Sequence, residues 1–186
     1  KSCSFYKDSM NVRSTIKVAL YPIYERRILA NLDLKKTPHH IGLILDGNRR
    51  WAKENPSATG DTSSAHGHRA GASKIIELLN WCEETEINLV TIWLLSSDNL
   101  KRPSGELESL FTIIGDTVKQ LSSTGRWKIR PVGSFELLPK ELRDTLNSAE
   151  SNTAQIGGIT VNVAIGYGGR LEIVDAVKRY IVDSAN

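Results

Sequence analysis

Residues 46–50 (DGNRR) bring together groups that can bind a phosphate and a metal ion. Guanidinium groups bind phosphate oxygens bidentately, backbone amides at a helix start bind anions, and an aspartate can hold the Mg²⁺ that neutralises them. Because the segment follows the apolar run His40–Leu45, it lies where a strand is expected to end. The sequence therefore predicts a diphosphate and Mg²⁺ site at Asp46. The structural alternative is an Asp-Gly turn with Asp46 capping a helix and the arginines in solvent.

Two further polar segments could serve the same chemistry. His66 and His68 precede an expected helix, where a histidine can donate to a phosphate or act as acid or base, although surface histidines are the more common occupants of such positions. The polar run 96–99 (SSDN) ends an apolar stretch and could equally be a helix cap. Arg102 would add another phosphate-binding guanidinium.

Short apolar runs predict the strands that position these groups. The expected strands are 40–45, 88–95, 127–132 and 159–165. Helix-period segments separate or follow them at 71–86, at 104–121, from Pro139 and from about Gly169. The alternation predicts an α/β fold: a mostly parallel central sheet with helices on both faces. Ligands of such sheets bind beyond the carboxyl ends of the strands, which is where the polar segments occur. Residues 54–65 are expected to form a mobile surface loop.

Composition narrows the class of protein. The chain has 186 residues, of which 40% are hydrophobic and 24% charged, which predicts one globular domain, residues 39–186, behind a helical arm, residues 1–38. The net charge of +3 is not concentrated in a basic block, so we expect no nucleic-acid partner. Cys3 and Cys82 lie far apart, which argues against a disulfide framework or a zinc site and fits a reducing cytoplasm. The apolar stretch 18–32 is too short and too charged to span a bilayer.

Four segments together resemble the cis-prenyltransferase (undecaprenyl diphosphate synthase-like) family. They are residues 40–53 (HIGLILDGNRRWAK), 66–72 (HGHRAGA), 93–103 (WLLSSDNLKRP) and 162–170 (NVAIGYGGR), in the family's order and spacing. The resemblance implies a Mg²⁺-dependent transferase of isoprenoid biosynthesis, which condenses an allylic prenyl diphosphate with isopentenyl diphosphate and creates a cis double bond. It also implies a homodimer in the cytoplasm with at most peripheral membrane contact.

The resemblance assigns roles to individual residues. Asp46 is expected to hold Mg²⁺ and assist diphosphate departure, and Asn99 is the candidate proton acceptor, with a diphosphate oxygen as the alternative acceptor. The expected substrate-binding residues are Gly47, Asn48, Arg49, Arg50, Trp51, His68, Ser96, Ser97, Asp98, Leu100 and Arg102. These roles fit the physics, because ionising an allylic C–O bond separates charge that preorganised donors and a metal stabilise.

The sequence also departs from the family pattern. The family has an arginine two to three residues before the 66–72 segment; it is missing here, and Ser63 and Ser64 occupy that neighbourhood. Leu100 stands where the family often has an aromatic residue. The family's C-terminal segment, rich in Arg and Ser, binds isopentenyl diphosphate and does not occur before Asn186, so we expect the C-terminal portion of the fold to be absent. Two other functions stay open: a Mg²⁺ phosphohydrolase, disfavoured by Asn48 two residues after Asp46, and a non-catalytic subunit of a prenyltransferase complex, disfavoured by retention of Asp46.

Leu94 bears on product length. In the family, the second residue before the SSDN-like cluster lines the product tunnel, and long-chain members usually carry a small residue there. The bulky Leu94 resembles the short-chain type and predicts a short product, most simply (Z,E)-farnesyl diphosphate from geranyl diphosphate. A longer-chain polyprenyl diphosphate synthase is the alternative, in which Leu94 is ordinary strand core.

Overall fold

A computed structural model describes residues 12–184 of the chain, which divides into a unit of residues 1–37 and a unit of residues 38–186. In the first unit, helix α1 (Val12–Asn31) is followed by the 3₁₀ turn η1 (Leu34–Lys36). Asp33 caps this turn, since its side chain accepts a hydrogen bond of 3.2 Å from the Lys35 amide.

The second unit contains a four-stranded parallel sheet. Its strands are β1 (His40–Ile44), β2 (Leu89–Ser96), β3 (Lys128–Gly133) and β4 (Thr160–Tyr167), in the spatial order β1-β2-β4-β3. Each strand lies within two residues of a run predicted from the sequence, so the α/β class and the parallel sheet are confirmed. Because β1 and β2 are parallel neighbours, their carboxyl ends lie side by side. Residues 46–50 and 96–99, which follow these strands, therefore lie at the same edge of the sheet.

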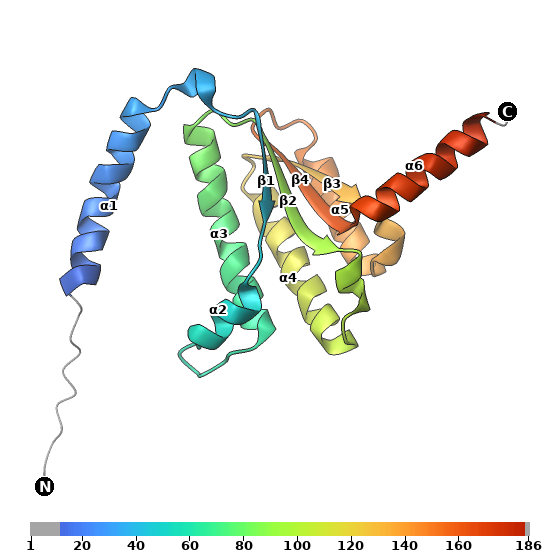
Figure 1. Ribbon diagram of the computed structural model, residues 1–186, viewed down its shortest axis with the longest axis horizontal. Coiled ribbons are helices and arrows are strands. Elements are labelled where there is room, and N and C mark those ends of the chain that lie inside the picture. The colour runs from blue at the N-terminus through green and yellow to red at the C-terminus, as the bar shows by residue number, and fades with distance from the viewer. Residues whose placement is uncertain (1–11, 185–186) are drawn as a thin grey trace, which may run out of the picture. The chain divides into compact units, whose positions relative to one another are not determined.

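Helices pack on this sheet and enclose a single core (Figure 1). The helices of the unit are α2 (Asn48–Glu54), α3 (Ser64–Glu84), α4 (Ser104–Ser123), α5 (Lys140–Thr153) and α6 (Gly169–Ser184), with 3₁₀ turns η2 (Asp98–Lys101) and η3 (Phe135–Leu137). Side chains of α3, α4 and α5 pack on alternate residues of the strands, including Ile92, Ile129 and Val163. Helices flank the sheet as expected, and at the end of the edge strand β1 the side chain of Ile44 is 63% exposed.

Helix α3 begins seven residues before the position expected from the sequence, at Ser64 rather than Gly71. The side chain of Ser63 accepts a hydrogen bond from the His66 amide and caps the helix. Gly67 and Gly71 therefore lie inside the helix, although glycine has a low helix propensity. A Cβ at Gly67 would lie 2.0 Å from the Asn48 carbonyl oxygen, so the glycine is needed for α2 to approach α3. The loop before α3 accordingly spans residues 55–63.

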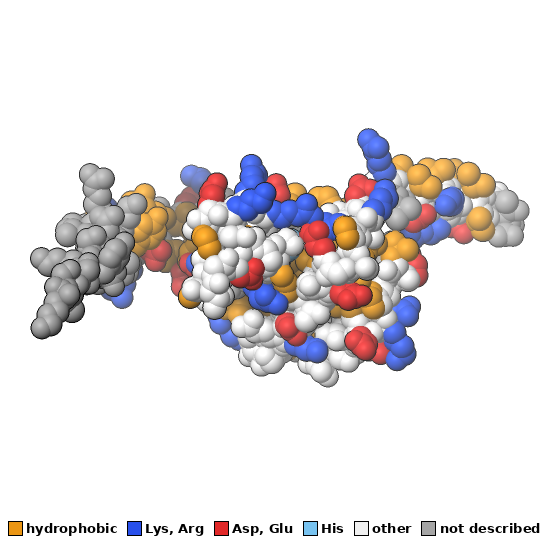
Figure 2. Space-filling view, turned by 90° about the horizontal axis from the view of Figure 1, so that it is seen from below, with side chains coloured by type: hydrophobic (Ala, Val, Ile, Leu, Met, Phe, Trp, Pro, Cys, Tyr) orange, Lys and Arg blue, Asp and Glu red, His pale blue; other side chains and the backbone are white. Residues whose placement is uncertain are grey.

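Helix α6 leaves several apolar side chains on the surface, visible as an orange stripe in Figure 2. Ile173, Val174, Val177, Tyr180 and Ile181 are all exposed. No helix within residues 12–184 is long and apolar enough to cross a membrane. Cys82 is a free thiol buried in the core, where desolvation raises its pKa, and Cys3 lies outside the described residues.

Candidate active site

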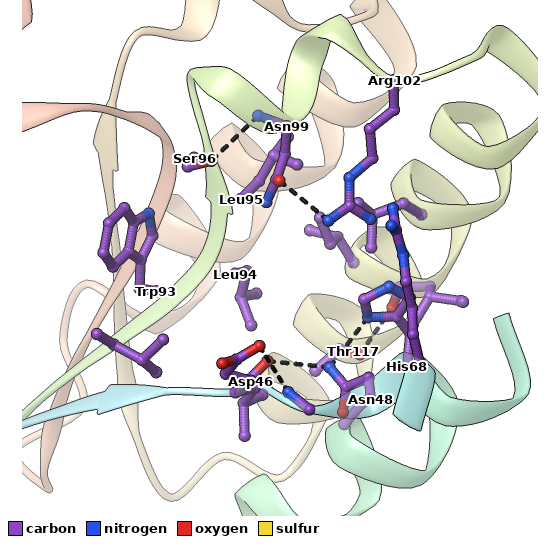
Figure 3. Close-up of a pocket in the computed structure, with 18 of the residues that line it drawn as sticks. Asp46, Asn48, His68, Trp93, Leu94, Leu95, Ser96, Asn99, Arg102 and Thr117 are labelled. Carbon is purple, nitrogen blue, oxygen red and sulfur yellow. Dashed lines mark hydrogen bonds between the residues drawn. The ribbon is translucent and has the colours of Figure 1, made fainter. Parts of the chain in front are cut away.

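A pocket of about 460 Å³ opens at the carboxyl ends of β1 and β2 (Figure 3). Its rim is polar and its interior is apolar. The polar rim residues are Asp46, Asn48, Arg49, Arg50, His68, Ser96, Asn99 and Arg102, with the backbone of Gly47 among them. The interior is lined by Ile44, Leu45, Ala72, Trp93, Leu94, Leu95, Leu110, Ile113, Ile114 and Thr117. Such a pocket fits a ligand with an anionic head and a hydrocarbon tail.

The carboxylate of Asp46 is positioned by the sharp turn that joins β1 to α2. Gly47 adopts a left-handed conformation with φ of 86°, which a side chain would strain, and its amide donates to Asp46 Oδ1 at 2.6 Å. The turn therefore directs the carboxylate to the rim of the pocket. The structural alternative had Asp46 capping a helix, but Gly47 is the N-cap of α2 and no side chain caps that helix, so the turn leaves Asp46 at the pocket edge.

Asn48 and His68 are joined across the α2–α3 contact. Asn48 Nδ2 donates to the Leu45 carbonyl oxygen at 3.0 Å and lies 3.1 Å from His68 Nδ1. His68 Nε2 is buried and has no hydrogen-bond partner among the described residues. Desolvation lowers the pKa of His68, and the nearby charge of Arg102 lowers it further. The pocket therefore contains a neutral imidazole with one ring nitrogen unpaired.

Glu106, in the first turn of α4, holds two of the rim arginines. Its Oε1 accepts from Arg49 Nη2 at 2.7 Å and from Arg102 Nη1 at 2.9 Å. Partial burial acts to raise the pKa of Glu106, but its hydrogen bonds and ion pairs with both arginines outweigh this, and the net pKa lies below the ordinary value. Sequence reasoning missed Glu106; its spacing of four residues after Arg102, at the start of a helix, was the available signal.

Ser96 and Asn99 lie across the pocket from Asp46 (Figure 3). Ser96 Oγ accepts a hydrogen bond from the backbone N–H of Asn99 at 3.1 Å, which fixes the turn that follows β2. Asn99 Oδ1 accepts from Arg102 Nη2 at 3.0 Å. Because this oxygen already faces a cation, the Asn99 side chain can offer the pocket its Nδ2 donor more readily than a proton acceptor.

Four of the residues expected at the substrate lie outside the pocket lining. Trp51 is 42% exposed and stacks on His66 with ring centroids 5.4 Å apart. Asp98 is exposed and pairs with Lys101 at 2.9 Å. Ser97 packs against Gly168, where an added Cβ would lie 2.3 Å from the Ser97 hydroxyl, and Leu100 packs against the core. The turn η2 sends successive side chains in different directions, so neighbours in sequence do not share the site.

Leu94 reaches the pocket through an irregularity in β2. Trp93 pairs with Ala164 and Leu95 with Ile165, so Leu94 is passed over in the register with β4. The extra residue lets three consecutive side chains, 93–95, line the pocket. In Figure 3 Leu94 lies between Asp46 and Asn99 in the view.

Asp46 is compatible with a Mg²⁺ site that the substrate helps to complete. Within residues 12–184 no group of three or more His, Cys, Asp or Glu side chains could hold a metal ion without other ligands. Mg²⁺, however, commonly binds one or two carboxylates together with substrate phosphates and waters. The single carboxylate at the rim of an anion-binding pocket fits that type of site.

Comparisons with known proteins agree with this arrangement. Residues 44–186 match the family described as "Putative undecaprenyl diphosphate synthase". The chain is 50% identical over 175 residues to isoprenyl transferase 1 of Streptomyces avermitilis, covering 94% of this chain and 66% of that protein. It is 48% identical over 170 residues to the (2Z,6E)-farnesyl diphosphate synthase of Thermobifida fusca, covering 91% of this chain and 65% of that one.

Solved structures show the same fold. Lavandulyl diphosphate synthase from Lavandula x intermedia, in complex with dimethylallyl diphosphate, is 30% identical with a TM-score of 0.70, over 78% of this chain and 62% of that chain. A probable undecaprenyl diphosphate synthase from Campylobacter jejuni is 24% identical with a TM-score of 0.62, over 80% of this chain and 64% of that chain, and shows the fold alone.

The fold and the family match define an α/β protein of the cis-prenyltransferase class. The chain belongs to the undecaprenyl diphosphate synthase family. It spans about two thirds of the length of the curated relatives it matches, 66% and 65% for the two named above.

Proposed function

We propose that this protein is a short-chain cis-prenyltransferase, which condenses geranyl diphosphate with isopentenyl diphosphate to (Z,E)-farnesyl diphosphate. The observation that carries the proposal is the pocket itself, with cationic and donor groups at its rim and an apolar interior to which Leu94 contributes. A relative with 48% identity is named a (2Z,6E)-farnesyl diphosphate synthase, which supports a short product.

In this proposal, the rim binds the allylic diphosphate and stabilises its departure. Arg50 and Arg102 bind phosphate oxygens, and His68 supplies a hydrogen bond from its unpaired ring nitrogen. Mg²⁺ held by Asp46 would neutralise negative charge on the departing diphosphate. Donors that are in place before the C–O bond breaks need no reorganisation when the charge develops, and this is expected to supply much of the rate.

We assign the proton acceptor to an oxygen of the released diphosphate rather than to Asn99. The amide oxygen of Asn99 accepts a hydrogen bond from Arg102, and a cationic donor reduces the basicity of an already weak base. Asn99 then orients the reactants through Nδ2, and Ser96 holds Asn99 in place. Condensation forms one C–C bond, breaks the allylic C–O bond and releases one proton to the diphosphate.

A longer-chain polyprenyl diphosphate synthase is the second candidate, because another relative with 50% identity is named only an isoprenyl transferase. A non-catalytic subunit is less well supported, since Asp46, His68 and Arg102 all line the pocket. A phosphohydrolase with Asp46 as nucleophile is disfavoured because the position two residues on, Asn48, is bonded to Leu45 and His68 and offers no carboxylic acid.

The test uses the complete protein with labelled isopentenyl diphosphate and geranyl diphosphate, followed by chromatography of the dephosphorylated products. The proposal expects a C15 alcohol with one new cis double bond. Products of many isoprene units would favour the second candidate. Release of phosphate without a new C–C bond would contradict both.

The homodimer, the cytoplasmic location and peripheral membrane contact stay predictions from the family resemblance. The exposed apolar side chains of α6 are the kind of surface that subunit interfaces bury. Sedimentation velocity of the complete protein is the direct test of the homodimer.

A further inference from the structure

The hydrogen bond between Asn48 and His68 determines which nitrogen of the imidazole carries the proton. The side-chain nitrogen of Asn48 lies 3.0 Å from the Leu45 carbonyl oxygen, which can only accept. Turning the amide over would place two acceptor oxygens against each other at this distance. The atom facing Leu45 is therefore the NH₂ group of Asn48.

The same NH₂ group lies 3.1 Å from His68 Nδ1. Because an amide nitrogen donates and does not accept, Nδ1 must be the unprotonated nitrogen of the ring. A neutral imidazole with an unprotonated Nδ1 carries its proton on Nε2. That is the buried nitrogen without a partner among the described residues, in a side chain that lines the pocket.

The packing of α3 leaves room for this orientation of Asn48. A Cβ added at Gly71 would lie 2.7 Å from Asn48 Oδ1, so the amide oxygen occupies space that any other residue at 71 would fill. The glycines of α3 thus admit both the α2 backbone and the Asn48 side chain. The segments 46–50 and 66–72 are therefore packed directly against each other.

The charges around His68 keep it neutral. Burial lowers its pKa, and the guanidinium groups of Arg102 and Arg49 lower it further, while Glu106 acts in the opposite direction without outweighing them. These groups approach from α2 and from the start of α4. A neutral ring can be fixed in one tautomer by one hydrogen bond, whereas a charged ring would carry protons on both nitrogens.

We propose that Asn48 is a positioning residue that fixes His68 as the neutral Nε2–H tautomer, so that His68 offers the pocket one donor and no acceptor. Asn48 then acts through His68 rather than by touching the substrate. This deepens the proposed function and rests on it for its purpose, since a diphosphate oxygen is an acceptor that such a donor fits. His68 in this state is not a general base, because its basic nitrogen faces Asn48.

The first experiment is ¹⁵N NMR of the imidazole rings in the complete protein, without substrate, with His68→Gln to assign the signals. We expect His68 Nε2 to be protonated and Nδ1 to be unprotonated at pH 7. A proton on Nδ1, or a ring charged at pH 7, would overturn the proposal. His66 is an internal control, because its Nε2 lies 3.0 Å from the Asn55 carbonyl oxygen and does not depend on Asn48.

The second experiment is the same measurement on Asn48→Asp, which keeps the shape and replaces the donor by an acceptor. The carboxylate should draw the proton of His68 to Nδ1 and raise its pKa, while the His66 signals stay unchanged. Unchanged His68 signals would show that Asn48 does not set the tautomer. If this variant is unfolded, Asn48→Ala replaces it, and a mixture of the two neutral tautomers is expected.

Neither measurement uses a prenyl diphosphate, so the two proposals can fail separately. A His68 ring in the other tautomer would overturn the role of Asn48 and leave the condensation assay untouched. Absence of condensation by the complete protein, with the tautomer as expected, would contradict the proposed function alone.

Discussion

Arg49 and Glu106, which are 57 residues apart in the chain, form an ion pair of 2.7 Å that ties α2 to the start of α4 beside the pocket. The carboxylate is shared with Arg102, so two guanidinium groups from different elements are held by one side chain. When an anion binds, these two side chains lose little further conformational entropy, because their positions are already fixed. The pair therefore preorganises the rim and also contributes to stability.

Glu106→Gln should lower the free energy of unfolding by roughly 1 kcal/mol at pH 7, since it removes a charge shared by the largely buried Arg102 and the exposed Arg49. Because the folded-state pKa of Glu106 is depressed, its stabilisation is present above the unfolded pKa of about 4.5 and is lost as pH falls through the lower folded value. Urea unfolding of both proteins from pH 7 to pH 3 should show the difference shrinking below about pH 4.5.

The matched control is Glu108→Gln, an exposed glutamate on the same helix. Its stability should stay within about 0.5 kcal/mol of the wild type at every pH. An equal loss in the two variants would mean that the ion pairs of Glu106 contribute nothing specific.

Gly67→Ala should destabilise the fold by about 2 kcal/mol or more, because the new methyl group would lie 2.0 Å from the Asn48 carbonyl oxygen and would push α2 away from α3. Gly105→Ala is the control within a helix: nothing lies within 4 Å of its added Cβ, so stability should be unchanged or rise by up to about 1 kcal/mol. Thermal unfolding measures both. Similar effects of the two substitutions would contradict the close α2–α3 contact.

The strands were predictable because each is a short apolar run between polar segments, and the parallel arrangement followed from the alternation with helices. The start of α3 was not, since its signal is the Ser63 cap, whereas Gly71 has the low helix propensity typical of a boundary. Gly67 and Gly71 are inside the helix for a tertiary reason, the approach of Asn48, and local propensity carries no information about such contacts.

The candidate site was predictable where a residue directly follows a strand, as Asp46 and Ser96 do. Trp51 and Asp98 are expected at the substrate from the family resemblance; neither lines the pocket, since Trp51 contacts His66 and Asp98 pairs with Lys101, and their role in binding stays a prediction. Glu106 does not line the pocket but contacts two rim residues, Arg102 and Arg49, and Arg49 is distant from it in the chain. Relationships of that kind depend on the packed fold rather than on a local pattern.

Asp46→Asn in the complete protein should lower the rate of condensation by at least about 100-fold, because it removes the carboxylate proposed to hold Mg²⁺ beside the departing diphosphate. Among the described residues the Asp46 side chain accepts a local hydrogen bond, from the Gly47 amide, so the fold should persist. Asp144→Asn is the control, since Asp144 lies on α5 and pairs with Lys140. Near-normal turnover by a folded Asp46→Asn protein would refute the metal assignment.

Arg102→Ala should weaken binding of inorganic pyrophosphate by about 10-fold or more, the usual effect of deleting a charged hydrogen-bond partner of a phosphate. Isothermal titration calorimetry at fixed ionic strength measures this directly. Arg130→Ala removes an equal charge from an exposed position on the edge strand β3 and should leave the affinity within about 2-fold. Equal losses in the two variants would indicate a general charge effect instead of a site at the pocket rim.

Leu94→Ala in the complete protein should lengthen the product beyond C15. Each added isoprene unit buries about five carbons, worth roughly 4 kcal/mol at ~0.8 kcal/mol per CH₂, so elongation is favourable wherever the pocket has room. Leu94 lines the pocket, and forcing a chain past a packed side chain costs ~1–3 kcal/mol or more. Chromatography of dephosphorylated products compares this variant with Leu137→Ala, an exposed leucine remote from the pocket lining. Long products from the wild type would rule out the short-chain proposal, and a C15 product from Leu94→Ala would assign the length limit to another side chain of the interior.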